Sequence, residues 1–197
     1  MSRMMMSHEE MRILLEQRLK RSRYEHSLGV AETALKLAKR FHVDEEKAYV
    51  AGLLHDCARE FPNGELMREA EKRGIAIGPV ERAMPLLLHA YIGAYRVKEL
   101  YGVEDREISQ AIWRHTVGGA DMTPLDQIVY FADMIEPHRE YPKAEQLRML
   151  AETAPLDEML LAGLSASILF VVQKQHLVHP DTVTARNEIL MRRNAQT

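Results

Sequence analysis

A histidine and an aspartate stand side by side at the end of an apolar run, where neither side chain can simply fill core space. His55 and Asp56 follow the segment Ala51-Gly-Leu-Leu54. A buried imidazole or carboxylate needs hydrogen-bond partners or a metal ion, because an unpaired polar group in apolar surroundings costs free energy. The pair alone is weak evidence, since roughly one chain in three with this His and Asp content contains such a dipeptide by chance.

Four further candidate ligands lie in apolar or helical settings elsewhere in the chain: His26, His89, His115 and Asp133. Histidine and aspartate are ligands that borderline and hard divalent metal ions accept. Asp133 is the hardest to explain as a structural residue, because it lies within the apolar segment 129–135 and a carboxylate there is rarely left unpaired. The ordered set therefore predicts one shared metal site.

Taken singly, each histidine also has a structural explanation. His26 could be exposed, and His89 follows three leucines and could be a core residue with a backbone partner. His115 could interact with the dipole at the end of a helix. The remaining histidines have no such setting, and we expect them on the surface: His8, His42, His138 and His176. One metal site explains the ordered set together, which the single explanations do not.

Apolar residues recur at intervals of three and four almost throughout, and no strand alternation stands out. We therefore expect an all-α fold, one compact domain over residues 1–197 with its core at about 21–190. Helices are expected at about residues 7–20, 21–41, 44–59, 63–74, 85–101, 105–118, 123–137, 143–153, 155–175 and 181–194. Adjacent helical residues point about 100° apart, so His55 and Asp56 can share one ion only where the helix loosens, as at its end.

A metal ion held by such residues supplies Lewis acidity and activates water near neutral pH, which suits attack on phosphorus. Two arrangements fit the sequence. Asp56 could bridge two ions, the second held with His89 and His115, or four residues could hold one ion while these two histidines contact phosphate. Imidazole with carboxylate is compatible with iron, manganese, zinc or nickel.

Composition excludes several functional classes. The net charge of −3 gives no overall field that favours nucleic acid or an anionic membrane. The single cysteine, Cys57, allows no internal disulfide, which fits a reducing cytoplasm, and we expect its thiol to be packed in the core. Residues 1–10 lack the apolar core of a secretory signal. The most apolar stretch, residues 160–172, is short for a membrane span, and we expect a buried core helix there.

The order His26, His55-Asp56, Asp133 resembles the metal signature of the HD-domain phosphohydrolase superfamily. Further segments resemble one branch of it, the bacterial YqeK-type symmetrical diadenosine tetraphosphate hydrolases. These segments are Arg23-Tyr-Glu-His-Ser-Leu-Gly-Val-Ala-Glu32, Leu87-Leu-His-Ala90, Ala111-Ile-Trp-Arg-His-Thr-Val-Gly118, Met122-Thr-Pro-Leu-Asp126, Phe131-Ala-Asp-Met-Ile-Glu-Pro137 and Val178-His-Pro-Asp-Thr-Val-Thr-Ala-Arg-Asn187. With the His-Asp segment they span residues 23 to 187, nearly the whole chain.

The resemblance implies metal-dependent hydrolysis of diadenosine tetraphosphate to two ADP, with iron as the expected metal. It implies metal ligation by His26, His55, Asp56 and Asp133, and catalytic roles for Asp56, His89 and His115. The residues expected to contact substrate are His26, His89, His115, Thr116, Asp133, Arg139, His179, Asp181 and Thr182. A planar guanidinium such as that of Arg139 suits bidentate phosphate binding.

This sequence departs from the branch at two positions near the expected pocket. Ala90 and His138 stand where glycine is usual, which changes side-chain bulk but not the ligand set. Structural roles compete at the nucleotide loop, where Asp181 is expected to cap the last helix whether or not it touches ligand.

Three functions follow as hypotheses. The first is a dinucleoside polyphosphate hydrolase that acts on nucleotide in the cytoplasm, binds neither nucleic acid nor membrane, and is compatible with a homodimer. The second is an HD-type phosphodiesterase or nucleotidase with another nucleotide substrate. The third is a non-enzymatic nucleotide sensor, which the intact ligand set disfavours.

Overall fold

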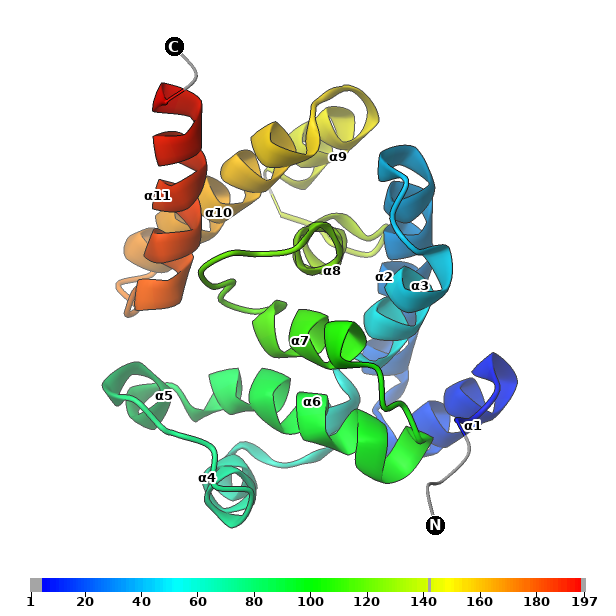
Figure 1. Ribbon diagram of the computed structural model, residues 1–197. Helices are drawn as coiled ribbons and strands as arrows, with labels where there is room; N and C mark the ends of the chain where they lie inside the picture. Colours follow the sequence, from blue (N-terminus) through cyan, green and yellow to red (C-terminus); the bar gives the residue numbers. More distant parts are fainter. Residues whose placement is uncertain (1–4, 142, 196–197) are drawn as a thin grey trace.

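The fold consists of helices joined by short connections (Figure 1), and the computed structural model describes residues 5–141 and 143–195. No strand occurs within these two ranges. The α-helices are α1 (His8–Arg18), α2 (Arg21–Phe41), α3 (Glu45–Leu54), α4 (Asn63–Lys72), α5 (Pro79–Ala83), α6 (Leu88–Tyr101), α7 (Arg106–Arg114), α8 (Pro124–Ile135), α9 (Ala144–Thr153), α10 (Leu156–Gln173) and α11 (Pro180–Asn194), with the 3-10 helices η1 (Cys57–Glu60) and η2 (Pro85–Leu87). The all-α prediction is confirmed.

Capping residues start the helices where the sequence predicts. Ser7 and Glu10 form a reciprocal capping box at α1, and Thr123 and Asp126 form another at α8. Each box satisfies two backbone amides that have no partner inside the helix. At the other end of α6, Gly102 adopts a left-handed conformation with a φ of 70°, which favours glycine. Local sequence therefore fixes these helix ends, among them the start of α8, which carries Asp133.

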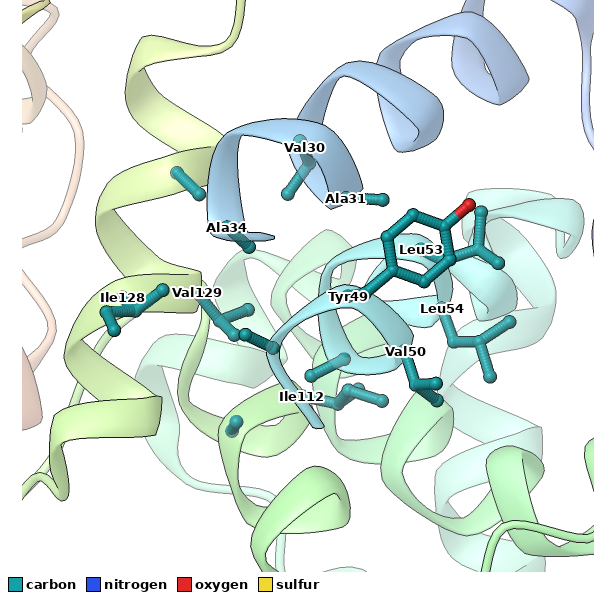
Figure 2. Close-up of a cluster of buried hydrophobic side chains, with 14 of the residues drawn as sticks. Val30, Ala31, Ala34, Tyr49, Val50, Leu53, Leu54, Ile112, Ile128 and Val129 are labelled. Carbon is teal, nitrogen blue, oxygen red and sulfur yellow. The ribbon is translucent and has the colours of Figure 1, made fainter. Parts of the chain in front are cut away.

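Helix α8 lies near the centre of the molecule and packs against α2, α3, α7, α9 and α10 (Figure 1). Figure 2 shows the apolar side chains at this meeting point, among them Val30 of α2, Leu53 of α3, Ile112 of α7 and Val129 of α8. These four residues are fully or nearly fully buried. Burial of large apolar side chains contributes roughly 1.5–3 kcal/mol each, so this cluster fixes the four helices to one another.

Cys57 follows the same pattern of burial. Its side chain has no exposed surface, and its thiol contacts the carbonyl oxygen of Gly93 at 3.8 Å. Burial raises the pKa of this thiol to about 12. The prediction that Cys57 packs in the core is confirmed.

Helix α3 ends earlier than expected. The sequence predicts a helix to about residue 59, whereas α3 ends at Leu54 and η1 begins at Cys57. Between them Asp56 takes a φ of −100° and a ψ of 14°, outside the α-helical range. The chain therefore leaves helix geometry at the His-Asp pair, which is the condition for both side chains to face one point.

The expectation for the most apolar stretch is wrong over its second half. Helix α10 extends that stretch to 18 residues with a mean hydropathy of 1.5, yet only 22% of it is buried. Leu169, Phe170 and Val172 are about half exposed. Hydropathy alone does not tell a helix buried within its own chain from one that leaves an apolar surface open. A single helix of this kind is weak evidence for a membrane span.

Helices α2 and α3 approach closely at Gly52, one turn before His55. A Cβ atom at this position would lie 2.9 Å from the Cα atom of Ala31 and 3.1 Å from the carbonyl oxygen of Val30. Both are backbone atoms, so the two helices would have to move apart to admit a methyl group. The glycine therefore sets the distance between the helix that carries His26 and the helix that ends at His55.

We predict that Gly52→Ala lowers the free energy of unfolding by about 1–3 kcal/mol, because overpacking strains a close-packed core. Gly64→Ala is the matched control, since a Cβ at this helical glycine would have no neighbour within 4 Å apart from its own helix backbone and adjacent residues. That variant is expected to be neutral or more stable by up to about 1 kcal/mol. Chemical denaturation of both proteins in chelator measures the difference, and equal stabilities would contradict the packing argument.

Candidate metal centre

The six predicted ligands come from separate parts of the chain and meet in one place. His26 lies within α2, His55 is the last residue associated with α3, and His89 is the second residue of α6. His115 ends α7, and Asp133 lies on α8. Three overlapping groups of these six residues each bring their ligand atoms within 4.8 Å of one another: His26, His55 and Asp56; His55, His115 and Asp133; and Asp56, His89 and His115. All but Asp133 are buried.

Asp56 lies between two pairs of histidines. Its Oδ2 atom is 3.7 Å from His26 Nε2 and 3.4 Å from His55 Nε2. Its Oδ1 atom faces the other way, 3.1 Å from His89 Nε2 and 3.9 Å from His115 Nε2. One carboxylate thus offers one oxygen to each pair, which is the arrangement that a bridging ligand between two ions requires.

Asp133 lies beside the first pair of histidines, His26 and His55. Its Oδ1 atom lies 2.9 Å from His26 Nε2 and 3.7 Å from His55 Nε2. The two Nε2 atoms are themselves 3.2 Å apart. Four potential ligand atoms from three helices and one turn therefore surround one point.

The imidazole rings are oriented by hydrogen bonds from their other nitrogen atoms. His55 Nδ1 donates to the Gly52 carbonyl oxygen at 2.7 Å, and His89 Nδ1 to that of Leu86 at 2.5 Å. His115 Nδ1 donates to Ile112 in the same way at 2.6 Å. A proton on Nδ1 leaves the Nε2 lone pair free, so these three rings present a ligand atom to the centre.

Electrostatics keep the carboxylates ionised. Burial would raise the pKa of Asp56, but its contacts with His55 and His89 outweigh this and hold the pKa well below its usual range. Burial would raise the pKa of Asp133, but its contact with His26 and the positive charge of Arg139 outweigh this and lower it. Carboxylates in this state are metal ligands without first losing a proton.

The two histidines with the clearest pKa shifts differ in direction. Burial, together with the nearby His55 and His89, lowers the pKa of His115 to about 3, so its imidazole is neutral at physiological pH. Burial would also lower the pKa of His26, but hydrogen bonds to Asp133 and Glu136 outweigh it, and the pKa is raised. A neutral imidazole is the form that binds metal ions.

Arginine side chains face the two carboxylates. Arg139 donates from Nη2 to Asp133 Oδ1 at 2.5 Å and from Nε to the carbonyl oxygen of the same residue at 2.8 Å. Arg23 Nη1 donates to Asp56 Oδ2 at 2.8 Å. Arg59 is half-buried in the field of both carboxylates, and burial lowers its pKa. Among the described residues, the guanidinium group of Arg59 has no hydrogen-bond or ion-pair partner, although its backbone amide donates to the carbonyl oxygen of Asp56.

Three residues of the centre have no role that the sequence alone indicates: Arg23, Arg59 and Glu136. Arg59 follows Asp56 by three residues, about one turn, so its position on the chain is a usable signal. Glu136 is visible within the segment 131–137 but has no evident partner in the sequence. Its partner is His26, 110 residues earlier, at 2.9 Å.

The remaining predicted substrate residues lie beside the centre or on its flank. Thr116 Oγ1 is 3.2 Å from His115 Nε2. Thr182 is buried and donates to the Val117 carbonyl oxygen at 2.8 Å, while His179 Nε2 is 3.0 Å from Glu81 Oε1. The loop before α11 is thus attached to the segment that follows His115. Its role in nucleotide binding stays a prediction.

One expectation about a single residue is wrong, and another is incomplete. His179 rather than Asp181 caps α11, since His179 Nδ1 accepts from the Asp181 backbone amide at 3.1 Å. Asp181 lies in the first turn, where its negative charge interacts favourably with the helix dipole. His138 is exposed as expected, but its backbone amide and its ring both contact the buried Glu136 carboxylate. It is therefore more than a solvated surface residue.

Comparison with known proteins agrees with this geometry. The family model described as "HD domain" matches residues 23–137. The symmetrical bis(5'-nucleosyl)-tetraphosphatase of Bacillus subtilis (strain 168) is 37% identical over 182 residues, 92% of this chain and 97% of the relative. The protein of the same name from Halalkalibacterium halodurans is 36% identical over 178 residues, 90% of this chain and 94% of the relative.

A solved structure also matches in fold. The crystal structure of a predicted HD superfamily hydrolase involved in NAD metabolism from Clostridium acetobutylicum superposes with a TM-score of 0.90 at 36% identity, covering 95% of this chain and 99% of that one. This chain belongs to the HD domain family. The family binds divalent metal ions, and the cluster of imidazoles and ionised carboxylates fits such an ion by the chemistry of its donors.

We predict that His55→Ala or Asp56→Ala abolishes metal binding while most helical structure is retained, because each removes a ligand atom from the centre of the cluster. Elemental analysis of protein purified without chelator measures the metal, and far-ultraviolet circular dichroism measures the helices. His176→Ala, at an exposed histidine on the loop after α10, is the matched control and should retain the metal of the parent protein. Full metal occupancy in either centre variant would contradict the prediction.

Proposed function

We propose that this protein is a metal-dependent symmetrical bis(5'-nucleosyl)-tetraphosphatase that hydrolyses diadenosine tetraphosphate to two ADP. The observation that carries the proposal is an intact His-Asp cluster in a chain that matches enzymes of that name over nine tenths of its length. Water attacks an inner phosphorus, the central P–O–P bridge breaks, and ADP leaves. One water enters, so two ADP molecules account for every atom.

His26, His55, Asp56 and Asp133 would hold the ion, and Asp56 with His89 and His115 would hold a second where two are bound. Iron is the expected metal, and the donor set also suits manganese, zinc or nickel. When bound, the ion supplies Lewis acidity toward water and toward phosphoryl oxygen.

The protein's own groups orient the reactants. Asp56 accepts hydrogen bonds and is held ionised. Its carboxylate therefore orients the attacking water as a hydrogen-bond acceptor and does not remain protonated. His89 and His115, with Nε2 atoms 3.1 Å apart, face the same space. In the arrangement with a single ion, the Thr116 hydroxyl beside His115 can donate to a phosphoryl oxygen, while His115 Nε2, whose lone pair is free, can accept a hydrogen bond from water.

The arginines around the centre are the proposed polyphosphate site. A tetraphosphate chain carries several negative charges, and its binding needs cations on the side opposite the histidines. Arg23 and Arg139 are already paired with Asp56 and Asp133, whereas Arg59 is free among the described residues to receive a phosphate. Charge-assisted, bidentate contacts from guanidinium groups are among the stronger hydrogen bonds in proteins.

The outer parts of the nucleotide are assigned to the loop that holds His179, Asp181 and Thr182. Its support is the bond from Thr182 to Val117, which places this loop next to the segment after His115. We further propose that residues 1–197 act as one domain, since α10 packs on α8 and this loop is attached to the segment after α7.

We predict that Arg59→Ala lowers kcat/KM by roughly 10- to 100-fold, the effect of losing one charged hydrogen bond of about 1.5–3 kcal/mol. Arg139→Ala should act mainly on substrate binding and raise KM. Steady-state kinetics with diadenosine tetraphosphate measure both, with Arg106→Ala, at the start of α7, as the control arginine. An unchanged KM and kcat in a variant removes that arginine from the site.

The test of the function itself is product analysis. Metal-loaded protein is incubated with diadenosine tetraphosphate, and the nucleotides are separated by chromatography. ADP as the sole product, lost on chelation and restored by metal, is the expected result. ATP with AMP would mean asymmetrical cleavage, and no turnover by a metal-loaded protein would contradict the proposal.

A second candidate is an HD-type nucleotidase or phosphodiesterase for another nucleotide. It is favoured by the similar Clostridium acetobutylicum protein, which is described as involved in NAD metabolism. The same chromatography with NAD, mononucleotides and cyclic nucleotides distinguishes it. A sensor without activity would bind nucleotide and turn over none of them.

We also propose that the protein works in the cytoplasm as a homodimer that does not bind nucleic acid. The support for the dimer is the open apolar face of α10 at Leu169, Phe170 and Val172. Light scattering after gel filtration measures the mass, and a monomer at micromolar concentration would contradict the dimer. Phe170→Asp should dissociate the dimer. Lys174→Asp, which changes the charge of an exposed residue outside the apolar face, should not.

A further inference from the structure

We propose that Glu136 is a positioning residue for the metal centre. Its carboxylate keeps the proton of the His26 imidazole on Nδ1, so that the Nε2 lone pair faces the ion. In this proposal position 29 is glycine because a larger residue would displace the Glu136 carboxylate. The inference rests on the proposed role of His26 as a ligand. Glu136 touches no other member of the six-residue cluster through its carboxylate.

Two kinds of hydrogen-bond acceptor orient the imidazole rings of the four histidines in the centre. His55, His89 and His115 each donate from Nδ1 to the carbonyl oxygen three residues earlier. His55 and His115 end α3 and α7, where carbonyl groups are not fully used by the i to i+4 ladder, and the acceptor of His89 is a carbonyl group of the short η2 that precedes α6. The backbone itself therefore fixes these three rings.

His26 has no such acceptor. It is the sixth residue of α2, a helix of 21 residues, so the carbonyl groups one turn earlier accept helix hydrogen bonds. Its ring nitrogen instead reaches across to the end of α8, where Nδ1 donates to Glu136 Oε1 at 2.9 Å. A ligand in the middle of a helix needs a partner from another element, and Glu136 is that partner.

The backbone of α2 is adapted to this carboxylate at Gly29. Gly29 follows His26 by three residues and so lies on the same face of α2. A Cβ atom at position 29 would lie 2.7 Å from Glu136 Oε2, closer than real Cβ contacts. Glycine inside a helix is less favourable than alanine, and the space that it opens here is filled by the carboxylate.

The carboxylate is itself held in place. Its side chain is 1% exposed, and Oε2 accepts the His138 backbone amide at 2.8 Å and lies 3.1 Å from His138 Nδ1. Arg148 donates to the carbonyl oxygens of Ile135, Glu136 and Arg139, which fixes the turn that ends α8. Glu136 has therefore little freedom to leave His26.

Without the Glu136 acceptor, the neutral His26 imidazole would favour the tautomer that carries its proton on Nε2. His26 Nε2 lies 2.9 Å from Asp133 Oδ1, which is hydrogen-bond distance. A proton on Nε2 would satisfy Asp133 but would occupy the lone pair that the ion needs. Glu136 shifts the choice of tautomer toward the ligating form, as carboxylate partners of metal-binding histidines do elsewhere.

The experiment measures metal affinity and tautomer in the full chain, without substrate. The variants are Glu136→Ala, which removes the acceptor, and Gly29→Ala, which displaces it by a helix-favouring change. Zn²⁺ affinity is measured by competition with a chromophoric chelator, and the tautomer of His26 in metal-free protein by long-range nitrogen–proton correlation spectra. Gly64→Ala is the matched glycine control.

We expect both variants to bind Zn²⁺ roughly 10- to 100-fold more weakly, the usual effect of losing a hydrogen-bond partner of a ligand. Their His26 signals should move from the Nδ1–H toward the Nε2–H form, and Gly64→Ala should match the parent protein in both. If Glu136→Ala does not fold, Gly29→Ala decides alone. Parent affinity together with the parent tautomer in Gly29→Ala would overturn the proposal. Because no nucleotide is present, failure of the proposed substrate leaves this result unaffected.

Discussion

The structure depends on the close approach of two ionised carboxylates, buried Asp56 and partly exposed Asp133, and four buried imidazoles. A carboxylate in apolar surroundings is costly without partners, and Arg23 and Arg139 pair with these two. The Nε2 and carboxylate oxygen atoms that face one another form a set of ligand atoms that one ion or two can satisfy. This requirement explains why α2, α3, α7 and α8 converge, and why a glycine stands where α2 and α3 are closest.

The ends of helices are where most of this chemistry takes place. The break between α3 and η1 turns His55 and Asp56 toward one point, and backbone carbonyl groups three residues earlier orient three of the four rings. The turn after α8 combines two tasks, because Glu136 supports His26 while Arg139 faces the neighbouring carboxylate. A substitution in this short turn would therefore affect both the metal and the cationic face of the site.

Much of the fold, and the grouping of the six candidate ligands in one place, could be predicted from sequence because the signals are local. Capping boxes mark helix starts, apolar periodicity marks buried faces, and a carboxylate in an apolar helix at Asp133 demands a partner. The features that the sequence did not predict depend on contacts between residues far apart in the chain. The partnership of Glu136 with His26 spans 110 residues, and the open face of α10 follows from which neighbours cover it. Neither can be computed from hydropathy or spacing.

The origin of the ligands on five separate helices has a consequence for how the protein is made. His26 and Asp133 adjoin only after the intervening helices have packed, so an unfolded chain offers no ready site. Metal uptake then reports completed folding, and by mass action a bound ion stabilises only the finished structure. Cells with little available metal would therefore hold a pool of this protein that is less active and also shorter-lived.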